Sequence, residues 1–314
     1  MPDIELFFST PHPDYYLIAL GVSALLCALW FVRRAAKKGV SLAASLTALG
    51  LGALLGALAA RALYLLVEVG DTQLMAEMFF VPEDVREFGF AGALLGMLLG
   101  GCLAEKMFKA KGLLNALAAP GLMMIALARL AECFVPFGSG KYMEAGALQF
   151  FPLSMPDGYG EWMLSVWLLE ALWALGSLFY LLKRKNAPSP ADMLLALTLY
   201  HGGQIYLESL RAESLSYGFI RVSQLLAAVM LFLVLLRCAG QLRERKNDLG
   251  KRIGMYLVCV ALYIAAEFAL DRLTWPDIIV RLLMVPLTLF VLWTVLGAVF
   301  AVEKQRLASG KEES

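Results

Sequence analysis

Nine long apolar runs decide what this chain can fold into. A helix that crosses a bilayer needs about 20 mostly apolar residues. The runs are continuous, whereas the strands of a membrane barrel alternate apolar and polar residues. The sequence therefore predicts an all-α fold, a polytopic bundle of nine transmembrane helices. The runs are Tyr15–Val32, Leu42–Val67, Phe88–Leu103, Leu113–Ala131, Trp162–Leu182, Met193–Leu210, Ile220–Leu236, Ile253–Leu270 and Ile278–Val302.

The composition excludes an ordinary soluble protein. Of the 314 residues, 60% are hydrophobic and 17% are charged, whereas soluble chains average about 45–50% and about 25%. The five cysteines form no CxxC pair, so we expect neither a disulfide framework nor a metal site. We expect no cofactor and no nucleic-acid partner, although the net charge of +1 argues neither way on the second point.

Basic residues gather in every second loop. Of the 27 Lys and Arg residues, 19 follow the first, third, fifth, seventh and ninth runs. Short cytoplasmic loops carry such an excess, so we expect the N-terminus outside and the C-terminus inside. The charged stretch 241–252 predicts a cytoplasmic linker between a seven-helix domain (1–240) and a C-terminal hairpin (253–302) with a tail (303–314). The outer loop at about 132–161 is predicted to be a lid or interfacial segment, or else a surface loop with aromatic anchors.

Several polar side chains inside these runs share one depth. Counted from the cytoplasmic basic flanks at about 1.5 Å per residue, Arg61 lies about 34 Å, Arg129 about 27 Å and Gln204 about 28 Å along their helices. Tyr16 opens the first run at its outer end. Charged groups in spanning helices are costly and are usually functional. The outer-leaflet half of the bundle is therefore the predicted place of a site.

The sixth run carries the richest polar pattern. His201, Gln204, Glu208 and Arg211 step by three, four and three residues, which lines one face of a helix. Such a face is expected to point into the bundle or a cavity. Guanidinium groups match phosphate oxygens bidentately, and a phospholipid headgroup is the phosphate available at this depth. Glu208 can pair with an arginine or act as a base, and His201 can carry a proton near neutral pH.

Simpler roles exist for each of these residues. Arg211 can extend to the headgroups from a helix end, and Arg129 can form a structural i,i+3 pair with Glu132. His201 can be a hydrogen-bonded packing residue. In the last two runs, Glu267 and Arg281 are expected to bond with each other across the hairpin.

Seven segments between Asp14 and Leu236 stand in the same order as the helices of a known protein family. They are DYYLIALGVSALLCALWFVRRAAKKG, GALLGALAARALYLL, FGFAGALLGMLLGG, ALAAPGLMMIALARLAECF, WLLEALWALGSLFYLLKRK, YHGGQIYLESLRAES and VSQLLAAVMLFLVLL. In this order they resemble the helices of the bacterial prolipoprotein diacylglyceryl transferases, including their His-Gly-Gly, Gly-Arg-x-Gly-Asn and Leu-Tyr-Glu segments. The resemblance implies a multi-pass protein of the bacterial plasma membrane.

The resemblance also implies a reaction and a set of residues. The family moves the diacylglyceryl group of phosphatidylglycerol to the thiol of a lipobox cysteine in a prolipoprotein, and glycerol phosphate leaves. Arginines neutralise the phosphate as charge builds on the leaving group, and a base helps to form the nucleophilic thiolate. The residues that match polar positions of the family are Tyr16, Arg61, Arg129, Glu208 and Arg211. Tyr64 belongs to the motif of the second helix.

Four positions depart from the family pattern. Ala91 stands where the family has a histidine, and Gln204 where it has an arginine. Glu132 replaces the Asn of the signature, and Ala128 its first Gly. Three interpretations therefore remain: a divergent transferase, a family member without transfer activity that binds phospholipid or lipoprotein segments, and a small transporter or structural membrane protein. His201, one turn below Gln204, is a candidate substitute in the first case.

Overall fold

Within the residues that the structure describes, nine helices correspond to the nine predicted runs, so the all-α membrane fold is confirmed. The computed structural model describes residues 11–135, 138–144, 146–157, 159–184, 189–212, 214–242, 246–272 and 277–312. Eight of the helices are long and apolar enough to cross a membrane, and α8 is shorter, with 16 residues. The nine are α2 (Pro13–Lys37), α3 (Leu42–Glu68), α5 (Phe90–Met107), α6 (Leu113–Ala131), α7 (Val166–Lys183), α8 (Asp192–Leu207), α9 (Val222–Gln241), α10 (Lys246–Arg272) and α11 (Asp277–Glu312).

Some predicted boundaries are wrong. The fifth run was expected to be helical from Trp162, but its first four residues form a strand, because a short apolar run fits either structure. Helix α10 begins at Lys246, inside the predicted linker 241–252, of which 243–245 lie outside the described residues. Helix α11 continues through the predicted tail as far as Glu312.

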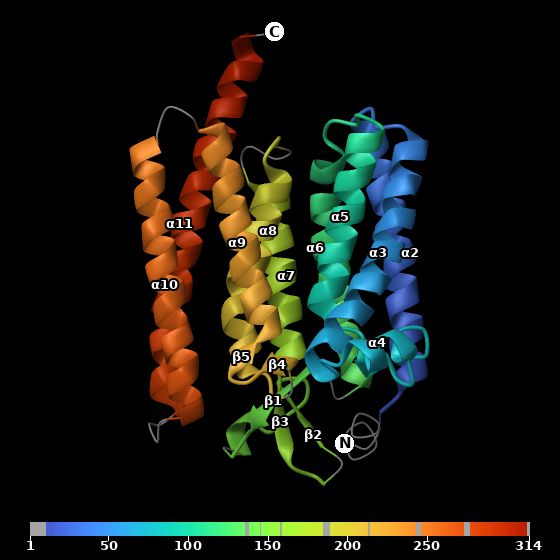
Figure 1. The fold of residues 1–314 in the computed structure, drawn as a ribbon, viewed down its shortest axis with the longest axis vertical. Helices are drawn as coiled ribbons and strands as arrows, with labels where there is room; N and C mark the ends of the chain where they lie inside the picture. The colour runs from blue at the N-terminus through green and yellow to red at the C-terminus, as the bar shows by residue number, and fades with distance from the viewer. Residues whose placement is uncertain are drawn as a thin grey trace. The chain divides into compact units, whose positions relative to one another are not determined.

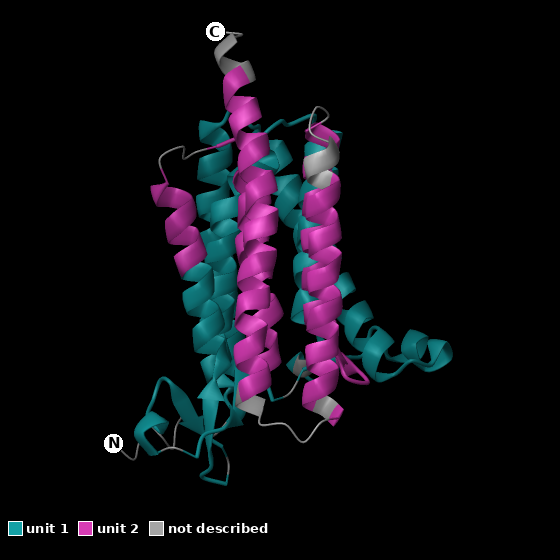
Figure 2. Ribbon diagram, turned by 90° about the vertical axis from the view of Figure 1, so that its left-hand side faces the viewer, with its two compact units in different colours: residues 1–175, 210–215 teal, residues 176–209, 216–314 magenta. Residues whose placement is uncertain are grey.

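The described chain forms two compact units (Figure 2). Unit 1 comprises residues 1–175 and 210–215, and unit 2 comprises residues 176–209 and 216–314. The division passes through α7, so that the first half of this helix belongs to unit 1. The predicted division into 1–240 and 253–302 stays a prediction of functional domains.

Glycines bring two helices of unit 1 into close contact. Helices α3 and α5 pack along their length (Figure 1). A Cβ atom on Gly92, Gly96 or Gly100 of α5 would overlap the backbone of α3. In lipid, small residues let helix backbones approach each other in this way. The α3–α5 interface therefore leaves no room for a side chain at these positions.

The loops between α3 and α5 and between α6 and α7 of unit 1 contain short ordered elements. Between α3 and α5 lie the helix α4 (Thr72–Met78), which Asp71 caps, and the 3-10 turn η1 (Val85–Glu87). Between α6 and α7 lie the 3-10 turn η2 (Glu132–Phe134), another at Gly146–Leu148, and a three-stranded antiparallel sheet. Its strands, in the order β1-β3-β2, are β1 (Ser139–Tyr142), β3 (Trp162–Ser165) and β2 (Ser154–Pro156).

Unit 2 is a bundle built around α8. Helices α9 and α11 pack against α8, and α10 packs against α11. A small hairpin of β4 (Ser216–Tyr217) and β5 (Ile220–Arg221) precedes α9. Gly218 in its turn has a φ of 64°, a conformation that favours glycine.

Candidate functional site

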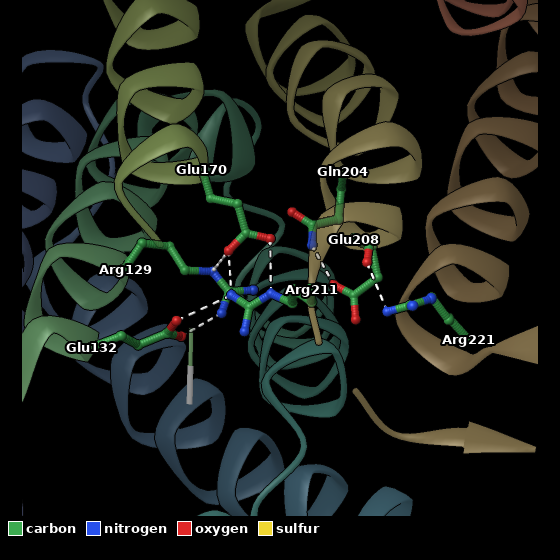
Figure 3. Close-up of polar contacts among 7 residues, drawn as sticks. All are labelled: Arg129, Glu132, Glu170, Gln204, Glu208, Arg211 and Arg221. Carbon is green, nitrogen blue, oxygen red and sulfur yellow. Dashed lines mark hydrogen bonds and ion pairs between the residues drawn. The ribbon is translucent and has the colours of Figure 1, made fainter. Parts of the chain in front are cut away.

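Two arginines and two glutamates form a closed ionic cluster in unit 1 (Figure 3). Arg129 pairs with Glu132, and its Nε lies 3.0 Å from Glu170 Oε2. Arg211 Nη2 lies 3.0 Å from Glu132 Oε2 and also pairs with Glu170 Oε2. Arg211 Nε donates a hydrogen bond of 3.2 Å to Glu170 Oε1. Each guanidinium therefore contacts both carboxylates. We call these four residues the ionic cluster.

The ionic cluster is buried and electrically balanced. The four residues are between 1% and 6% exposed. Two positive and two negative charges cancel, which a buried cluster requires because an unpaired charge in an apolar interior costs several kcal/mol. Arg211 does not reach outward from a helix end, as one interpretation of the sequence expected. The i,i+3 pair of Arg129 and Glu132 is present.

Three separate segments of the chain supply these side chains: α6 with η2, α7, and the segment around Arg211. Helix α6 ends at Ala131, and η2 continues the turn so that Glu132 follows Arg129 on one face. Arg211 forms a bridge with Gly140 of β1, and the neighbouring Ala212 N donates to Ser139 O at 3.0 Å. The three-stranded sheet thus fixes the segment that carries Arg211. A side chain at position 140 would overlap Leu210 O, so glycine is required there.

Glu170 is a site residue that the sequence reasoning missed. It lies near the start of α7 and is 1% exposed. The signal was available, since a single carboxylate stands inside the apolar segment WLLEALWALG. A carboxylate within a spanning helix is a functional candidate by its cost alone.

Tyr16 lies within electrostatic reach of the ionic cluster. The charges of Glu132, Arg129 and Arg211 all act on its phenol group. The start of α2 is tied to η2 through His12 N, which donates to Phe134 O at 2.7 Å. Tyr16 is therefore brought to the predicted site.

Arg61 is buried in a different set of contacts. Its Nη1 lies 2.5 Å from Glu87 Oε2, and its Nη2 donates to Met78 O at 2.6 Å. Its Nε donates to Phe79 O at 3.3 Å, and its Cζ lies 5.8 Å from the ring centre of Tyr64. Arg61 thus holds the end of α4 and the loop behind it. These contacts give Arg61 and Tyr64 a local structural role in addition to the predicted role in substrate binding.

In unit 2, three predicted residues share α8 and its end. Gln204 Nε2 donates to Glu208 Oε2 at 2.9 Å, as expected for residues on one helical face. His201, one turn earlier, is 9% exposed, and its ring lies against Tyr200. The prediction that Arg211 continues this face is wrong. The α-helix ends at Leu207 and the 3-10 turn η5 (Glu208–Leu210) follows, which changes the direction of the chain.

The ionic cluster offers two guanidinium groups and two carboxylates that are paired with each other. Among the residues that the structure describes, no group of three or more His, Cys, Asp or Glu side chains is placed to hold a metal ion. The arginines of the ionic cluster can exchange a carboxylate for another oxyanion such as a phosphate, because guanidinium binds carboxylates and phosphates in the same bidentate manner.

Comparisons with known proteins concern the first three quarters of the chain. A sequence model of the prolipoprotein diacylglyceryl transferase family matches residues 14–240. The chain is similar to the phosphatidylglycerol–prolipoprotein diacylglyceryl transferase of Clostridium novyi (strain NT), with 27% identity over 158 residues. This match covers 48% of the chain and 62% of that protein. Helices α10 and α11 lie beyond the residues that match the family.

Proposed function

Because the chain belongs to the prolipoprotein diacylglyceryl transferase family, we propose that it transfers a diacylglyceryl group from phosphatidylglycerol to a prolipoprotein cysteine at the outer leaflet. It is a multi-pass protein of the bacterial plasma membrane. In the reaction the cysteine thiol loses its proton and the sulfur attacks the glyceryl carbon. The carbon–oxygen bond to phosphate breaks, a thioether forms, and glycerol phosphate leaves.

The observation that carries this proposal is the ionic cluster. A phosphodiester brings one negative charge, and further negative charge builds on its oxygens as the bond breaks. Arg129 and Arg211 can stabilise that charge, since guanidinium groups held in place before the reaction need no reorganisation. The phosphate must then take over guanidinium contacts that Glu132 makes in the free protein. Glu132 thus competes with the lipid for the two arginines.

The proton of the attacking thiol needs an acceptor. Glu208 is the proposed base, because it lies at the end of α8 and Gln204 holds one of its oxygens. His201 is the proposed proton carrier one turn below. Tyr16, Arg61 and Tyr64 belong to the proposed substrate-binding residues, with Arg61 acting through the loop that it holds.

A second function is favoured by two features of the site. Both arginines of the ionic cluster are already fully matched by carboxylates, and the positions of the family histidine and arginine hold Ala91 and Gln204. A member of the family that binds anionic phospholipid or lipoprotein signal segments without transfer fits these features. The two candidates differ in product, since only the first forms a thioether.

Complementation tests the proposal. The chain is expressed in a bacterium whose own prolipoprotein transferase can be switched off, and lipoprotein maturation is followed by gel shift. We expect rescue of growth and maturation, and loss of rescue in Arg129→Ala. No rescue by a stable, inserted protein contradicts the transferase proposal and favours the lipid-binding candidate.

Glu132→Asn sharpens this test. It introduces the residue that the family pattern has at this position and changes the charge of the ionic cluster from zero to +1. We expect phosphatidylglycerol to bind about tenfold more tightly, because a charged competitor worth about 1.4 kcal/mol is removed. The matched control is Glu303→Gln, which removes one of the two buried carboxylates paired with Arg184 in unit 2. Equal effects of both changes contradict a role of the ionic cluster in phosphate binding.

A further inference from the structure

The two helices beyond the family match bind the end of α8 within unit 2. Tyr263 of α10 donates from its hydroxyl to Ile205 O at 3.1 Å. Arg281 of α11 donates from Nη1 to Ser209 O. Both side chains are buried, at 6% and 9% exposed. Ser209 directly follows Glu208, the proposed base.

The end of a helix needs such donors. The last carbonyl groups of a helix have no partner within it, and positive groups there also complement the helix dipole. Two donors come from α9 and the strand before it. Gln224 Nε2 donates to Ile205 O at 2.9 Å, and Arg221 Nη1 donates to Glu208 O at 3.0 Å. The hairpin of α10 and α11 supplies the other two donors.

The sequence-based expectation for Glu267 and Arg281 differs from these contacts. They were expected to bond with each other across the hairpin. Instead Glu267 Oε1 accepts from Gln224 Nε2 at 2.8 Å, and Arg281 reaches Ser209. Both charged groups therefore connect the hairpin to the part of the chain that matches the family.

Helix α11 is also fixed at the start of α8. Arg306 donates to Pro190 O at 2.5 Å and to Gln241 Oε1 at 2.8 Å. Glu303 Oε1 lies 2.8 Å from Arg184 Nη1. Helix α11 is therefore bonded to both ends of α8 and constrains α8 along its length. Arg281 makes its contact at the end of α8 that carries Glu208.

We propose that Arg281 is a positioning residue that fixes the turn Glu208–Leu210. By holding Ser209 O, it sets the direction of the Glu208 carboxylate at the end of α8. Its effect on catalysis rests on the proposed function, because the direction of Glu208 changes a rate only where transfer occurs. The hairpin is then part of the transfer machinery rather than an appended anchor.

The test compares three variants of the full chain in detergent: Arg281→Ala, Arg281→Lys and Arg252→Ala. Arg252 is the matched control, because its Nη1 also donates to a carbonyl, Thr294 O, at 3.1 Å, but within the hairpin. The first readout is amide hydrogen exchange of peptides that cover residues 205–212. The second readout is kcat and KM with phosphatidylglycerol vesicles and a synthetic lipobox peptide.

We expect Arg281→Ala to raise exchange in residues 205–212 about five- to tenfold, the effect of losing one buried hydrogen bond. We expect kcat to fall about 10- to 100-fold with little change in KM, since a displacement of about 1 Å costs up to about 100-fold. Arg281→Lys restores most of the rate, because its ammonium can still donate to Ser209 O. Arg252→Ala changes neither readout.

Other outcomes separate the two proposals. Unchanged exchange in residues 205–212, or a rise spread equally over the whole chain, overturns the positioning role. A local rise with an unchanged kcat in an active protein overturns the role in catalysis. If the unaltered protein transfers nothing, the proposed function fails, and the exchange measurement alone decides whether Arg281 fixes the turn.

Discussion

Helices α3 and α5 of unit 1 and helices α8 to α11 of unit 2 are held together by different means. In the first pair, glycines allow backbone to meet backbone. In the second group, buried side chains donate hydrogen bonds to carbonyls or carboxylates of neighbouring helices. Lipid provides no hydrophobic drive between helices, so close packing or polar bonds must replace it. The glycine interface tolerates no added atom, whereas the polar interface distributes its stability over several bonds.

The largest expected effect is at the glycine interface. Gly96→Leu places a side chain where even a Cβ would overlap the backbone of Leu55. Because backbone atoms cannot rotate away, the helices must separate, and we expect a loss of at least about 3 kcal/mol, the upper part of the range for overpacking. The measurement is the amount of monodisperse protein and its unfolding temperature in detergent.

Gly21→Leu on α2 is the matched control. A Cβ at Gly21 meets nothing within 4 Å, and leucine suits a helix surface in lipid. We expect this variant to be at least as stable as the unaltered protein. Equal damage from both substitutions would break the comparison, because the cost would then come from the residue type rather than from the α3–α5 interface.

An intermediate effect is expected from Arg184→Ala in unit 2. Arg184 contacts Asp192 Oδ1 at 2.5 Å and Glu303 Oε1 at 2.8 Å. Its removal leaves two buried carboxylates without their shared cation, and we expect a loss of about 3 kcal/mol. Denaturant titration in detergent measures this loss. Lys183→Ala removes an exposed cation one residue earlier and is expected to change stability by less than about 0.5 kcal/mol.

The smallest expected effect is from Tyr263→Phe. It removes one hydrogen bond to Ile205 O, while Gln224 still donates to the same carbonyl. Bonds of this kind between membrane helices average about 0.6 kcal/mol, so we expect a loss of that size in the same titration. Tyr180→Phe, at an exposed position of α7, is the control. A loss as large as that of Arg184→Ala would contradict a distributed polar interface.

The helices could be predicted from the sequence, but some of their ends could not. A spanning helix must be long and apolar, and this requirement is visible in each run. The strand at Trp162–Ser165 was missed because its hydrogen bonds go to β1 and β2, which lie outside the apolar run in which it was expected to be helical. The early start of α10 was missed because charged residues such as Lys251 and Arg252 indicate a linker by composition, although they are also good helix formers.

The candidate site could be predicted only in part. Arg129 was found because a charge inside an apolar run is costly and therefore conspicuous. Glu132 was found as its i,i+3 partner, and Arg211 by its spacing of three residues from Glu208. The way in which these residues pair could not be predicted, because it depends on Glu170 and on a bridge between Gly140 and Arg211. The partners of Arg61 are the carbonyls of Met78 and Phe79 as well as Glu87. Backbone carbonyls carry no sequence signal, so contacts of this kind appear only in the fold.

The ionic cluster has a consequence for how the protein is made. Arg211 lies 41 residues after Glu170, so the ribosome delivers Arg129, Glu132 and Glu170 before the last cation exists. At about 5–20 residues per second, this delay is about 2–8 s. During that interval the nascent chain holds two acidic groups and one basic group where the finished protein is neutral. Until Arg211 has been added, the two carboxylates of the ionic cluster therefore share a single arginine, Arg129.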